Sequence, residues 1–366
     1  MQAACGRVFT AASLLVARRG GVVLERAYGW LDDVGGERPA RLDTLFDLAS
    51  VTKLFTATAF MTLVDSGRVA LDDRVCRVVP QFAGWRPMAS TENPLTGEIE
   101  ILGDVSTLVD ADAVTFRHLL THTSGLPAWR ALYRLPDRAA AVSAVLASDF
   151  ACPTGTRILY SDLGLILLTE ALTRLADEPL DAFVRRVVLM PLGLQRATFN
   201  PSRETWPDIP PTEVCRWRGR RLRGEVHDEN AARLDGVSGH AGLFASVRDV
   251  AALGQMVLDS GVYAGARVLS PEAVGRMTRV QACWQGDRRG IGFMLQGVGE
   301  WRRAGLSDRA FGHTGFTGTS LWVDPAVETI VALLTNRVYF GRDAEGIQAL
   351  RRSVQAGVAS ALESHS

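Results

Sequence analysis

Ser50-Val51-Thr52-Lys53 stands immediately before the mainly apolar run 54–64. Apolar residues follow at the i, i+3, i+4 spacing of a buried helix face, at Leu54, Ala57, Met61 and Val64. Because residues three apart share one side of a helix, we expect Ser50 to begin a core helix with Lys53 beside it. An amine in that place can take the hydroxyl proton as the oxygen attacks a carbonyl carbon. The stretch therefore predicts a serine nucleophile with a lysine base.

Lys53 is the only lysine among the 40 lysine and arginine residues of the chain. Arginine keeps its proton in proteins, whereas lysine can lose it. Burial and the positive end of a helix both disfavour the ammonium, so we expect the pKa of Lys53 to lie below its ordinary value of about 10.4. A chain that uses arginine everywhere else favours a catalytic role for this one amine.

The composition excludes several classes of protein. The chain of 366 residues is 47% hydrophobic and 22% charged, which is typical of a soluble globular protein. Its formal net charge of zero gives no field that would draw it to nucleic acid or to a membrane. Five scattered cysteines argue against a disulfide framework or a zinc site and fit a reducing compartment. We therefore expect no metal and no nucleic-acid or membrane partner. No cofactor is expected either, and the predicted serine nucleophile indicates a small-molecule ester or amide as the partner, with the oligomeric state left open.

The N-terminal apolar segment 8–17 could be taken for the core of a signal peptide. It is followed directly by Arg18-Arg19-Gly20-Gly21 and then by a second apolar segment, which favours a strand–turn–strand hairpin. No uninterrupted apolar stretch reaches the roughly 18 residues of a membrane helix. These features predict a cytoplasmic location.

Strands are predicted near both ends of the chain and helices between them. The expected strands are 12–30 around Gly20-Gly21, 44–48, 290–298, 309–313, 319–324 and 329–336. One helix is expected to start at Ser50. Further helices are expected at 114–120, 137–147, 163–176, 180–188, 246–258 and 343–362. Residues 84–112 and 200–240 are expected to be irregular, because they combine Gly, Pro and polar residues without helical periodicity.

This order predicts a single catalytic domain over 1–366 in the α/β class. One antiparallel sheet would combine the N- and C-terminal strands, with helices flanking it and an all-helical lobe inserted. The α/β lobe would comprise about 1–66 and 240–366, and the mainly helical lobe about 67–239. A substrate cleft is expected between them.

Tyr160-Ser161-Asp162 stands directly before the helix expected at 163–176. A tyrosine hydroxyl near Lys53 could relay a proton to the leaving group as general acid and base. Asp162 could accept a hydrogen bond from Lys53 or orient a substrate amide. The structural alternative is a tyrosine packed at a helix start, with Asp162 as its N-cap.

His313-Thr314-Gly315 ends a predicted strand. A glycine there allows a substrate to approach the backbone closely. The next amide, that of Phe316, could point into the cleft beside the amide of Ser50, and two such donors form an oxyanion hole. The alternative for His313 is a histidine with a purely structural role at the strand end.

Ser50-x-x-Lys53, Tyr160-Ser161-Asp162 and His313-Thr314-Gly315, in this order, resemble the motifs of the penicillin-recognising serine hydrolases. The similar branch holds class C β-lactamases, D-Ala-D-Ala carboxypeptidases and β-lactamase-like carboxylesterases. Connecting phrases match as well, namely 121–127 (THTSGLP), 191–194 (PLGL) and 239–243 (GHAGL).

The resemblance implies the β-lactamase/transpeptidase-like fold and an acyl-enzyme on Ser50. Lys53 and Tyr160 would share the proton transfers, and the amides of Ser50 and Phe316 would form the oxyanion hole. The residues implied to line the substrate strand are His313, Thr314 and Gly315.

Two departures from the family pattern bear on the substrate. Asp162 stands where the family often has asparagine, and a carboxylate cannot donate to a substrate carbonyl. His313 replaces the more usual lysine and is expected to give a weaker, pH-dependent positive charge. The first departure weighs against β-lactam or peptide recognition, and the second weighs against a dedicated β-lactamase.

His227-Asp228-Glu229-Asn230, followed by His240, could suggest a metal site. The segment after Asn230 has no regular period, so no ligand geometry follows, and a loop at the edge of the cleft is favoured. His227 and Asn230 are then candidate substrate contacts. His118 and His122 are spaced i, i+4, but without a His-Glu-x-x-His pattern their roles are expected to be structural.

Residues 216–223 form the one basic cluster, with a tryptophan inside it. Nucleic acid could bind such a segment. Because the whole chain is neutral, a solvated loop or a cleft wall that favours acidic substrates is the preferred interpretation.

The sequence therefore predicts a serine hydrolase that cleaves esters of small to medium acyl groups. D-Ala-D-Ala carboxypeptidase or weak β-lactamase activity on the same residues is the alternative among enzymes. A non-catalytic protein that binds peptides or cell-wall fragments is the alternative of another class. No Gly-x-Ser-x-Gly occurs, which argues against a nucleophile-elbow hydrolase.

Overall fold

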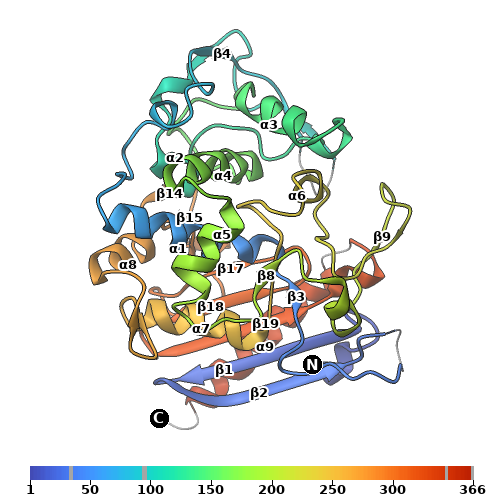
Figure 1. Cartoon of the computed structure of the whole chain (residues 1–366). Coiled ribbons are helices and arrows are strands. Elements are labelled where there is room, and N and C mark those ends of the chain that lie inside the picture. Colours follow the sequence, from blue (N-terminus) through green and yellow to red (C-terminus); the bar gives the residue numbers. More distant parts are fainter. Residues whose placement is uncertain (33–35, 93–96, 343–344, 364–366) are drawn as a thin grey trace.

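An eight-stranded antiparallel sheet forms the base of the molecule in the computed structural model, which describes residues 1–32, 36–92, 97–342 and 345–363 (Figure 1). The strand order is β14-β15-β16-β17-β18-β19-β1-β2. The strands are β1 (Ala11–Arg18), β2 (Gly21–Gly29), β14 (Ala282–Trp284), β15 (Asp287–Arg289), β16 (Met294–Leu295), β17 (Phe311–Thr314), β18 (Ser320–Asp324) and β19 (Thr329–Thr335).

The two ends of the chain meet where β1 pairs with β19, from Ala12 opposite Thr335 to Arg18 opposite Thr329. Asn336 fixes the end of this ladder, because its side-chain oxygen accepts from the backbone N–H groups of Thr10 and Ala11 at 3.1 and 3.0 Å. The prediction of one antiparallel sheet built from both termini is confirmed.

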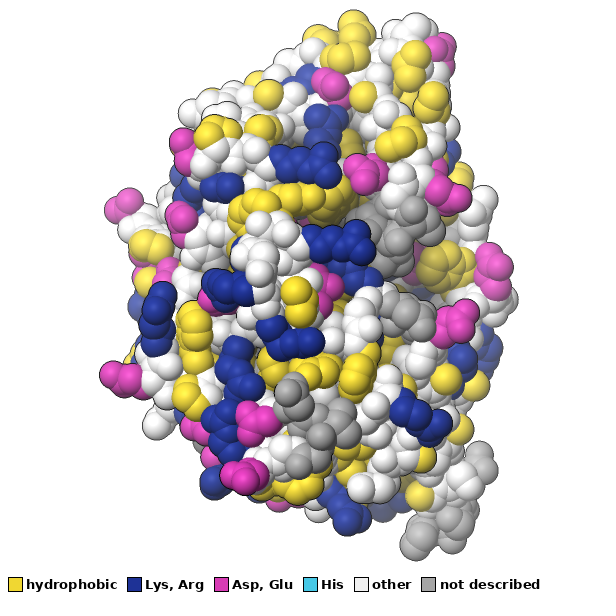
Figure 2. All heavy atoms as spheres, turned by 90° about the vertical axis from the view of Figure 1, so that its right-hand side faces the viewer, with side chains coloured by type: hydrophobic (Ala, Val, Ile, Leu, Met, Phe, Trp, Pro, Cys, Tyr) yellow, Lys and Arg dark blue, Asp and Glu magenta, His cyan; other side chains and the backbone are white. Residues whose placement is uncertain are grey.

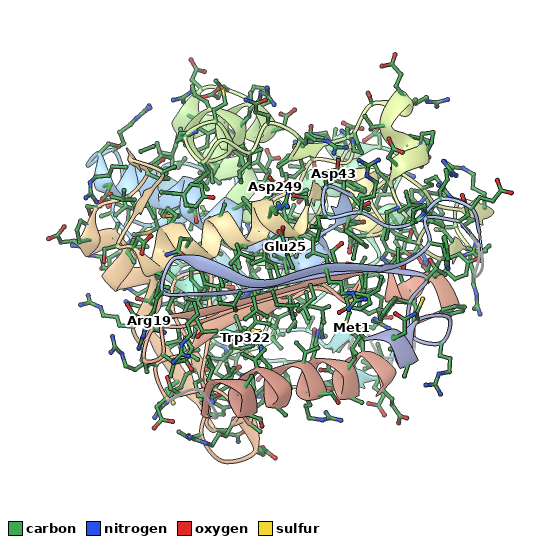
Figure 3. All side chains as sticks on the ribbon, turned by 90° about the horizontal axis from the view of Figure 1, so that it is seen from below. Met1, Arg19, Glu25, Asp43, Asp249 and Trp322 are labelled. Carbon is green, nitrogen blue, oxygen red and sulfur yellow. The ribbon has the colours of Figure 1, made fainter. Side chains whose placement is uncertain are left out.

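The two faces of the sheet follow from the alternation of side chains along each strand. Leu14 and Val16 pack with Ile347 and Leu350 of α9 (Glu345–Glu363) on one face. The intervening residue Leu15 belongs to the main core, which includes α7 (Val247–Leu258) on the other face. Figure 3 shows the two helices on opposite sides of the strands. The sheet is therefore covered on both faces.

The helix expected at Ser50 lies between the sheet and the helices of the segment 67–239 (Figure 1). Ser50 itself lies in a short 3-10 turn, Ala49–Val51, which runs directly into α1 (Thr52–Asp65). The sequence predicted one buried stripe, but α1 is buried around nearly its whole circumference. The reason is its central position, since both the sheet side and the helical side pack against it.

The segment 67–239 is mainly helical, as expected, but it also contains short two-stranded ribbons. Its helices are α2 (Phe116–Leu120), α3 (Arg138–Leu146), α4 (Asp162–Ala176), α5 (Leu180–Val184) and α6 (Glu229–Arg233). Its ribbon strands are β4 (Trp85–Pro87) with β7 (Leu108–Asp110), β5 (Thr91–Glu92) with β6 (Ile99–Glu100), and β9 (Val214–Cys215) with β10 (Arg220–Arg221). The description of this lobe as all-helical was therefore too strict, and its bounds stay a prediction.

A three-stranded sheet connects the segment after residue 239 to the Ser50 turn. β11 (Leu243–Ala245) lies between β3 (Phe46–Asp47) and β8 (Thr198–Phe199). The N–H of Leu48 also donates to the carbonyl of Leu243 at 3.0 Å. This small sheet brings residues near 240 up to the start of α1.

Other predicted elements differ in extent. The strand expected at 290–298 shortens to β16, and sequence inspection missed β14, β15, the hairpin β12 (Val262–Tyr263) with β13 (Ala266–Arg267), and α8 (Pro271–Thr278). The start of the last helix, at 343 and 344, lies outside the described residues. Within the described ranges, no helix combines the length and the apolar composition needed to cross a bilayer.

Candidate active site

The turn that carries Ser50 is held by a buried carboxylate. Asp47 accepts hydrogen bonds from the backbone N–H groups of Ala49 at 2.8 Å and His227 at 2.6 Å. Burial raises the pKa of Asp47, partly offset by these two N–H donors. Ala49 has a φ of +46°, which is costly for a residue with a side chain. The Asp47 carboxylate thus stabilises a strained turn that presents Ser50 at the start of α1.

Lys53 is 1% exposed, and its Nζ has three partners. It lies 2.9 Å from Ser50 Oγ and 3.0 Å from the carbonyl oxygen of His240. The third partner is Asp162 Oδ1 at 2.7 Å. The predicted pairing of Lys53 with Ser50 is present, and the His240 carbonyl arrives through the β11 connection.

The expected fall of the Lys53 pKa does not occur. Burial, the largest single influence, lowers the pKa of Lys53, but attraction to Asp162 and Tyr160 together outweighs it and raises the pKa above its ordinary value. Burial and the helix end can be inferred from the sequence, but the carboxylate at 2.7 Å cannot, because Asp162 is far from Lys53 along the chain. In the resting protein Lys53 is therefore an ammonium that donates to Ser50.

Tyr160 lies against the lysine, with Lys53 Nζ 4.9 Å from the centroid of its ring. Its hydroxyl interacts with both Lys53 and Ser50. Burial raises the pKa of Tyr160, although Lys53 opposes this shift, so the phenol is neutral. The predicted trio of Ser50, Lys53 and Tyr160 is thus assembled in one place.

The segment 122–128 positions Tyr160. The backbone N–H of Ser161 donates to His122 Nδ1 at 3.1 Å, and the ring of His122 lies 4.4 Å from that of Tyr160. The N–H of Asp162 donates to the carbonyl of Ala128 at 2.9 Å. Ser161, rather than Asp162, caps α4, because its Oγ accepts from the N–H of Gly164 at 3.1 Å. Asp162 is therefore available to pair with Lys53.

His118 and His122 have the structural roles expected. His118 Nδ1 accepts from the backbone N–H of Thr115 at 3.1 Å and completes the capping box of α2. Burial, together with Arg289 and Lys53, lowers the pKa of His122 well below its ordinary value. His122 is thus a neutral acceptor beneath Tyr160.

The end of β17 packs directly on the Ser50 turn. Thr317 Oγ1 donates to the carbonyl of Asp47 and Thr319 Oγ1 to that of Leu48, both at 2.7 Å. A Cβ atom at Gly315 would lie 2.5 Å from the Leu48 carbonyl oxygen, a contact that no side chain tolerates. Glycine is therefore required by the approach of Leu48, whereas the sequence argument had assigned the space to a substrate.

The two amides predicted for an oxyanion hole are those of Ser50 and Phe316. Within the described part of the chain, neither N–H has a hydrogen-bond acceptor. The peptide of Phe316 is fixed from its other side, because Arg337 Nε donates to the Phe316 carbonyl at 2.7 Å. Both groups are available to donate to a ligand.

His313 is neutral rather than a pH-dependent cation. Its Nδ1 lies 2.8 Å from the carbonyl oxygen of Thr314, which can only accept, so Nδ1 carries the proton and Nε2 is an acceptor. Burial, Lys53 and Arg289 lower the pKa of His313 well below its ordinary value. The expected pH-dependent charge at His313 is therefore a wrong prediction.

Arg289 supplies a permanent cation near the site, and sequence inspection missed it. Its guanidinium carbon lies 5.9 Å from the centroid of the Tyr160 ring. Asp287 holds it from the same strand, with Arg289 Nη2 2.7 Å from the Asp287 carboxylate and both side chains buried. Nothing in the sequence distinguishes this arginine from the others, because strand β15 is too short to have a readable pattern.

The candidate substrate contacts in the 227–230 loop differ in their surroundings. Asn230 is buried, and both ends of its amide bond to backbone, with Oδ1 accepting from Tyr133 N–H at 3.0 Å and Nδ2 donating to the Arg130 carbonyl at 2.8 Å. Its role is thus to fix the 130–133 turn. His227 stacks on the ring of Phe316, with the centroids 5.6 Å apart.

A group with metal-ligand chemistry lies beside Lys53. Ligand atoms of Asp162, Asp228 and His240 come within 4.8 Å of one another. Each is already engaged, since Asp162 pairs with Lys53 and His240 Nε2 lies 2.9 Å from Asp228 Oδ1. Ser238 Oγ lies 2.7 Å from His240 Nδ1. The described partners satisfy these side chains without an ion, and the arrangement holds the His240 segment against Lys53.

Comparison with known proteins gives one consistent result. A family model described as Beta-lactamase matches residues 4–356. A relative from Bacillus subtilis (strain 168), named N-acetylmuramyl-L-alanine amidase, is 30% identical over 370 residues, covering 90% of this chain and 77% of the relative.

Solved structures resemble the fold. EstCE1, titled a hydrolase with promiscuous acyltransferase activity, has a TM-score of 0.71 at 21% identity and covers 94% of each chain. A mutant of simvastatin synthase from Aspergillus terreus has a TM-score of 0.74 at 19% identity, covering 99% of this chain and 93% of the other. At these identities the likeness extends to the fold alone.

Proposed function

Since this chain belongs to the Beta-lactamase family and is a serine hydrolase of that family, we propose that it is a carboxylesterase acting on small to medium acyl esters. The observation that carries the proposal is the cluster of Ser50, Lys53 and Tyr160, with Lys53 Nζ 2.9 Å from Ser50 Oγ. The two amides without an acceptor, those of Ser50 and Phe316, stand ready for the carbonyl oxygen.

In the proposed acylation, the Lys53/Tyr160 pair first loses one proton, because Lys53 rests as an ammonium. Ser50 Oγ then forms a bond to the ester carbonyl carbon, and its proton passes to the pair. The negative oxygen that develops accepts from the two amides, each worth about 3 kcal/mol in the transition state. The bond to the alcohol oxygen breaks, and Tyr160 returns the proton to that oxygen.

Deacylation repeats these steps with water. The pair takes a proton from the water, whose oxygen attacks the acyl carbon, and the Ser50–carbon bond breaks. Ser50 regains its proton and the free acid leaves. Asp162 and the His240 carbonyl hold Lys53 in place throughout, since both contact its Nζ at 3.0 Å or less.

The environment of Asp162 supports ester rather than amide substrates. Its carboxylate pairs with Lys53 and has no N–H to donate to an amide carbonyl. The neutral His313 adds no charge for a substrate carboxylate at this strand. Ester hydrolysis needs less stabilisation of the transition state than amide hydrolysis, because an alcohol is a better leaving group than an amine.

Amide hydrolysis is the second candidate, as a D-Ala-D-Ala carboxypeptidase or a weak β-lactamase. The name of the Bacillus subtilis relative, an amidase, favours it. A binding protein without catalysis is a third possibility, against which the intact Ser50, Lys53 and Tyr160 argue.

A single panel separates these candidates. The protein and its Ser50→Ala variant are incubated with 4-nitrophenyl acetate and butyrate, nitrocefin and a D-Ala-D-Ala peptide. We expect ester turnover that disappears in Ser50→Ala. Turnover of the peptide or of nitrocefin alone would move the assignment to the second candidate, ester turnover that survives the substitution would contradict the mechanism, and no turnover of any substrate would favour the binding protein.

A further inference from the structure

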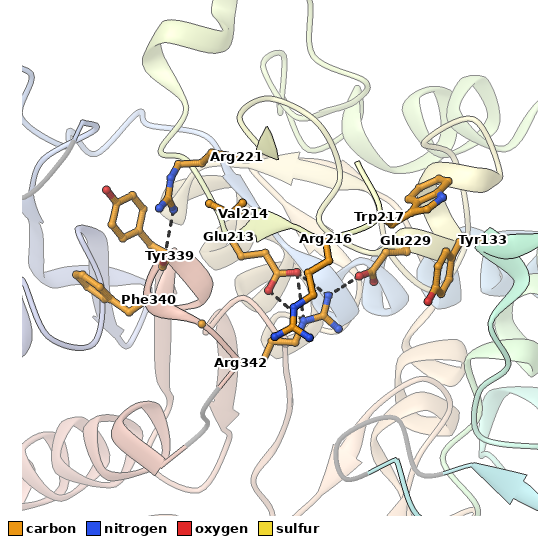
Figure 4. A pocket seen from close by; sticks show the side chains of 11 residues that line it. Tyr133, Glu213, Val214, Arg216, Trp217, Arg221, Glu229, Tyr339, Phe340 and Arg342 are labelled. Atoms are coloured by element: carbon orange, nitrogen blue, oxygen red, sulfur yellow. Dashed lines mark hydrogen bonds and ion pairs between the residues drawn. The ribbon is translucent and has the colours of Figure 1, made fainter. Parts of the chain in front are cut away.

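A pocket of about 590 Å³ opens beside the candidate active site (Figure 4). Its residues come from the 213–221 segment, the start of α6, the turn at Tyr133 and the segment 339–342. Glu213 connects it to the site, because Glu213 Oε1 lies 3.1 Å from His227 Nε2 and His227 stacks on Phe316. The pocket therefore lies just beyond the residue whose amide is the proposed oxyanion donor.

The acidic side chains of the pocket already have an arginine partner. Arg342 donates to Glu213 at 2.5 Å and also pairs with Glu229. Burial raises the pKa of Glu213, but hydrogen bonds from His227 and Arg342 outweigh it and lower that pKa to about 2. Both glutamates are thus paired with Arg342, whose single charge offsets one of their two negative charges.

Two other arginines of the pocket have no carboxylate partner among the residues that the structure describes. Arg216 is exposed and has no ion pair or hydrogen bond within the described residues. In the described part of the chain, Arg221 donates to two carbonyl oxygens, those of Thr212 at 2.7 Å and Tyr339 at 3.2 Å. The pocket lining therefore carries an excess of positive charge, although the chain as a whole is neutral.

The surface around the pocket has the same character. Arg218, behind the lining, donates to the carbonyls of Val226 and His227 at 2.7 and 2.8 Å. Figure 2 shows dark blue side chains gathered in the middle of the face on this side of the molecule. They are arginines, since the only lysine is buried. Three residues of the basic cluster noted in the sequence, Arg216, Trp217 and Arg221, thus line a cavity.

Aromatic rings form the two ends of the pocket. The rings of Tyr133 and Trp217 lie 5.4 Å apart at one end, and those of Tyr339 and Phe340 lie 5.0 Å apart at the other (Figure 4). Trp217 is 39% exposed and Phe340 is 47% exposed, so apolar surface is available to a ligand. A ligand that fits must combine an apolar body with negative charge.

We propose that this pocket binds a carboxylate group carried by the substrate at a distance from the scissile bond, with Arg216 and Arg221 as its partners. The proposal rests on the proposed function, since it assigns a substrate class to the same enzyme. Arginine suits the role, because its planar fork can bind a carboxylate through two hydrogen bonds. The paired rings would hold the chain that carries the carboxylate.

The test compares substrates that differ only in charge. Mono-4-nitrophenyl suberate is set against 4-nitrophenyl octanoate, which has the same acyl length, and 3-carboxyphenyl butyrate is set against phenyl butyrate. We expect the anionic ester to have the higher kcat/KM in at least one pair, by about five- to tenfold. Arg216→Gln should remove most of that preference, and added salt should weaken it.

Arg220→Gln is the matched control. Arg220 lies on the same ribbon, pairs with Glu225 at 2.6 Å and does not line the pocket, so its removal should leave the preference unchanged. Equal kcat/KM values within both pairs, or a preference that Arg216→Gln leaves intact, would overturn the proposal.

A binding measurement separates failure of the pocket from failure of the proposed function. Calorimetry on Ser50→Ala compares monomethyl suberate, which carries one carboxylate, with the neutral methyl octanoate and needs no turnover. We expect tighter binding of monomethyl suberate, weakened in Ser50→Ala/Arg216→Gln. If no ester is hydrolysed but this difference is present, the proposed function fails and the pocket stands. If monomethyl suberate binds no better than methyl octanoate, the pocket assignment is wrong.

Discussion

Lys53 lies in the candidate active site and Arg216 lines the neighbouring pocket, and the surroundings of these two cations are opposite in kind. Lys53 is 1% exposed and has three partners within 3.0 Å, including the carboxylate of Asp162. Arg216 is exposed and has no partner within the described residues. The ammonium of Lys53 is held in place, and its neighbours set its pKa, which suits a residue that transfers protons in catalysis. The guanidinium of Arg216 is available to bind a ligand, which suits a residue that recognises substrate.

We expect the largest effect when residue 53 can no longer lose its proton. Lys53→Arg should lower kcat/KM for 4-nitrophenyl butyrate on the order of 10³-fold, because arginine stays protonated. Circular dichroism and urea unfolding check that the variant is folded. Lys53→Met, which fits the same space without charge, serves as a second variant in case arginine does not fit.

Near-normal rates in folded Lys53→Arg would contradict the claim that residue 53 must lose its proton during catalysis. At the exposed position the same kind of exchange, Arg216→Lys, should retain part of the preference for anionic esters. The comparison thus predicts opposite tolerances at the two positions.

Asp162→Asn tests the contribution of the Asp162 carboxylate to the pKa of Lys53 and to stability. We expect the free energy of unfolding to fall by about 3 kcal/mol at pH 7, because a buried charge loses its partner. Asp162 raises the pKa of Lys53, so its stabilising contribution is present at neutral pH and is lost only as pH rises through that raised pKa.

The same variant should shift the pH–rate profile. Hydrolysis requires the Lys53/Tyr160 pair to lose a proton, so the rate should rise with pH in the wild type. Without Asp162 the pKa of Lys53 falls, and this rise should move to lower pH. An unmoved profile would mean that Asp162 does not set the proton affinity of Lys53.

Glu213→Gln addresses the ion pairs of the pocket. The pKa of Glu213 is lowered to about 2, so its contribution to stability is present above pH of about 4.5 and lost as pH falls toward 2. We expect a loss of about 2 kcal/mol at pH 6 that shrinks steadily with acidification. Urea unfolding at several pH values measures it.

Glu328→Gln is the control for this measurement. Glu328 forms an exposed ion pair with Arg19 at 3.5 Å, so its removal should change the unfolding free energy by less than about 0.5 kcal/mol at any pH. A Glu213→Gln effect that is equally small would show that the Arg342 network contributes nothing.

The smallest expected effect is an absence of titration. Burial and nearby cations lower the pKa of both His122 and His313 well below the ordinary value of about 6.5. Neither ring should therefore titrate between pH 6 and 8, as measured by the ¹⁵N shifts of the imidazoles. A midpoint in that range for His313 would restore the pH-dependent charge expected from the sequence.

The sequence was sufficient to identify Lys53 as the catalytic candidate, but not to identify the residues that set its pKa. Lys53 was singled out because no other lysine competes with it, and its spacing from Ser50 is a local property of a helix. Its other partners, Asp162 and the His240 carbonyl, lie more than a hundred residues away in the chain, and only the packed fold brings them within 3.0 Å. Local patterns therefore predicted the pair and gave the wrong direction for its pKa.

The residues proposed to bind the substrate were harder to predict than Lys53, because the chain contains many arginines and only one lysine. Arg289 beside Tyr160 has no spacing that sets it apart from the other arginines. Arg216 belongs to the basic cluster 216–223, but the cluster alone does not indicate which of its arginines line a pocket. The pocket itself is assembled from segments near 133, 213–221, 229 and 339–342. The joining of the two termini in one sheet could be predicted, since apolar strands at both ends need a common core.

Mass spectrometry of the acyl-enzyme tests the central claim most directly. The protein is mixed with 4-nitrophenyl butyrate, quenched in acid within the first turnovers, and mapped by peptide digestion. We predict one butyryl group, on the peptide that contains Ser50, which is absent from Ser50→Ala. Ester hydrolysis with the acyl group on another residue, or an adduct that persists in Ser50→Ala, would contradict the account.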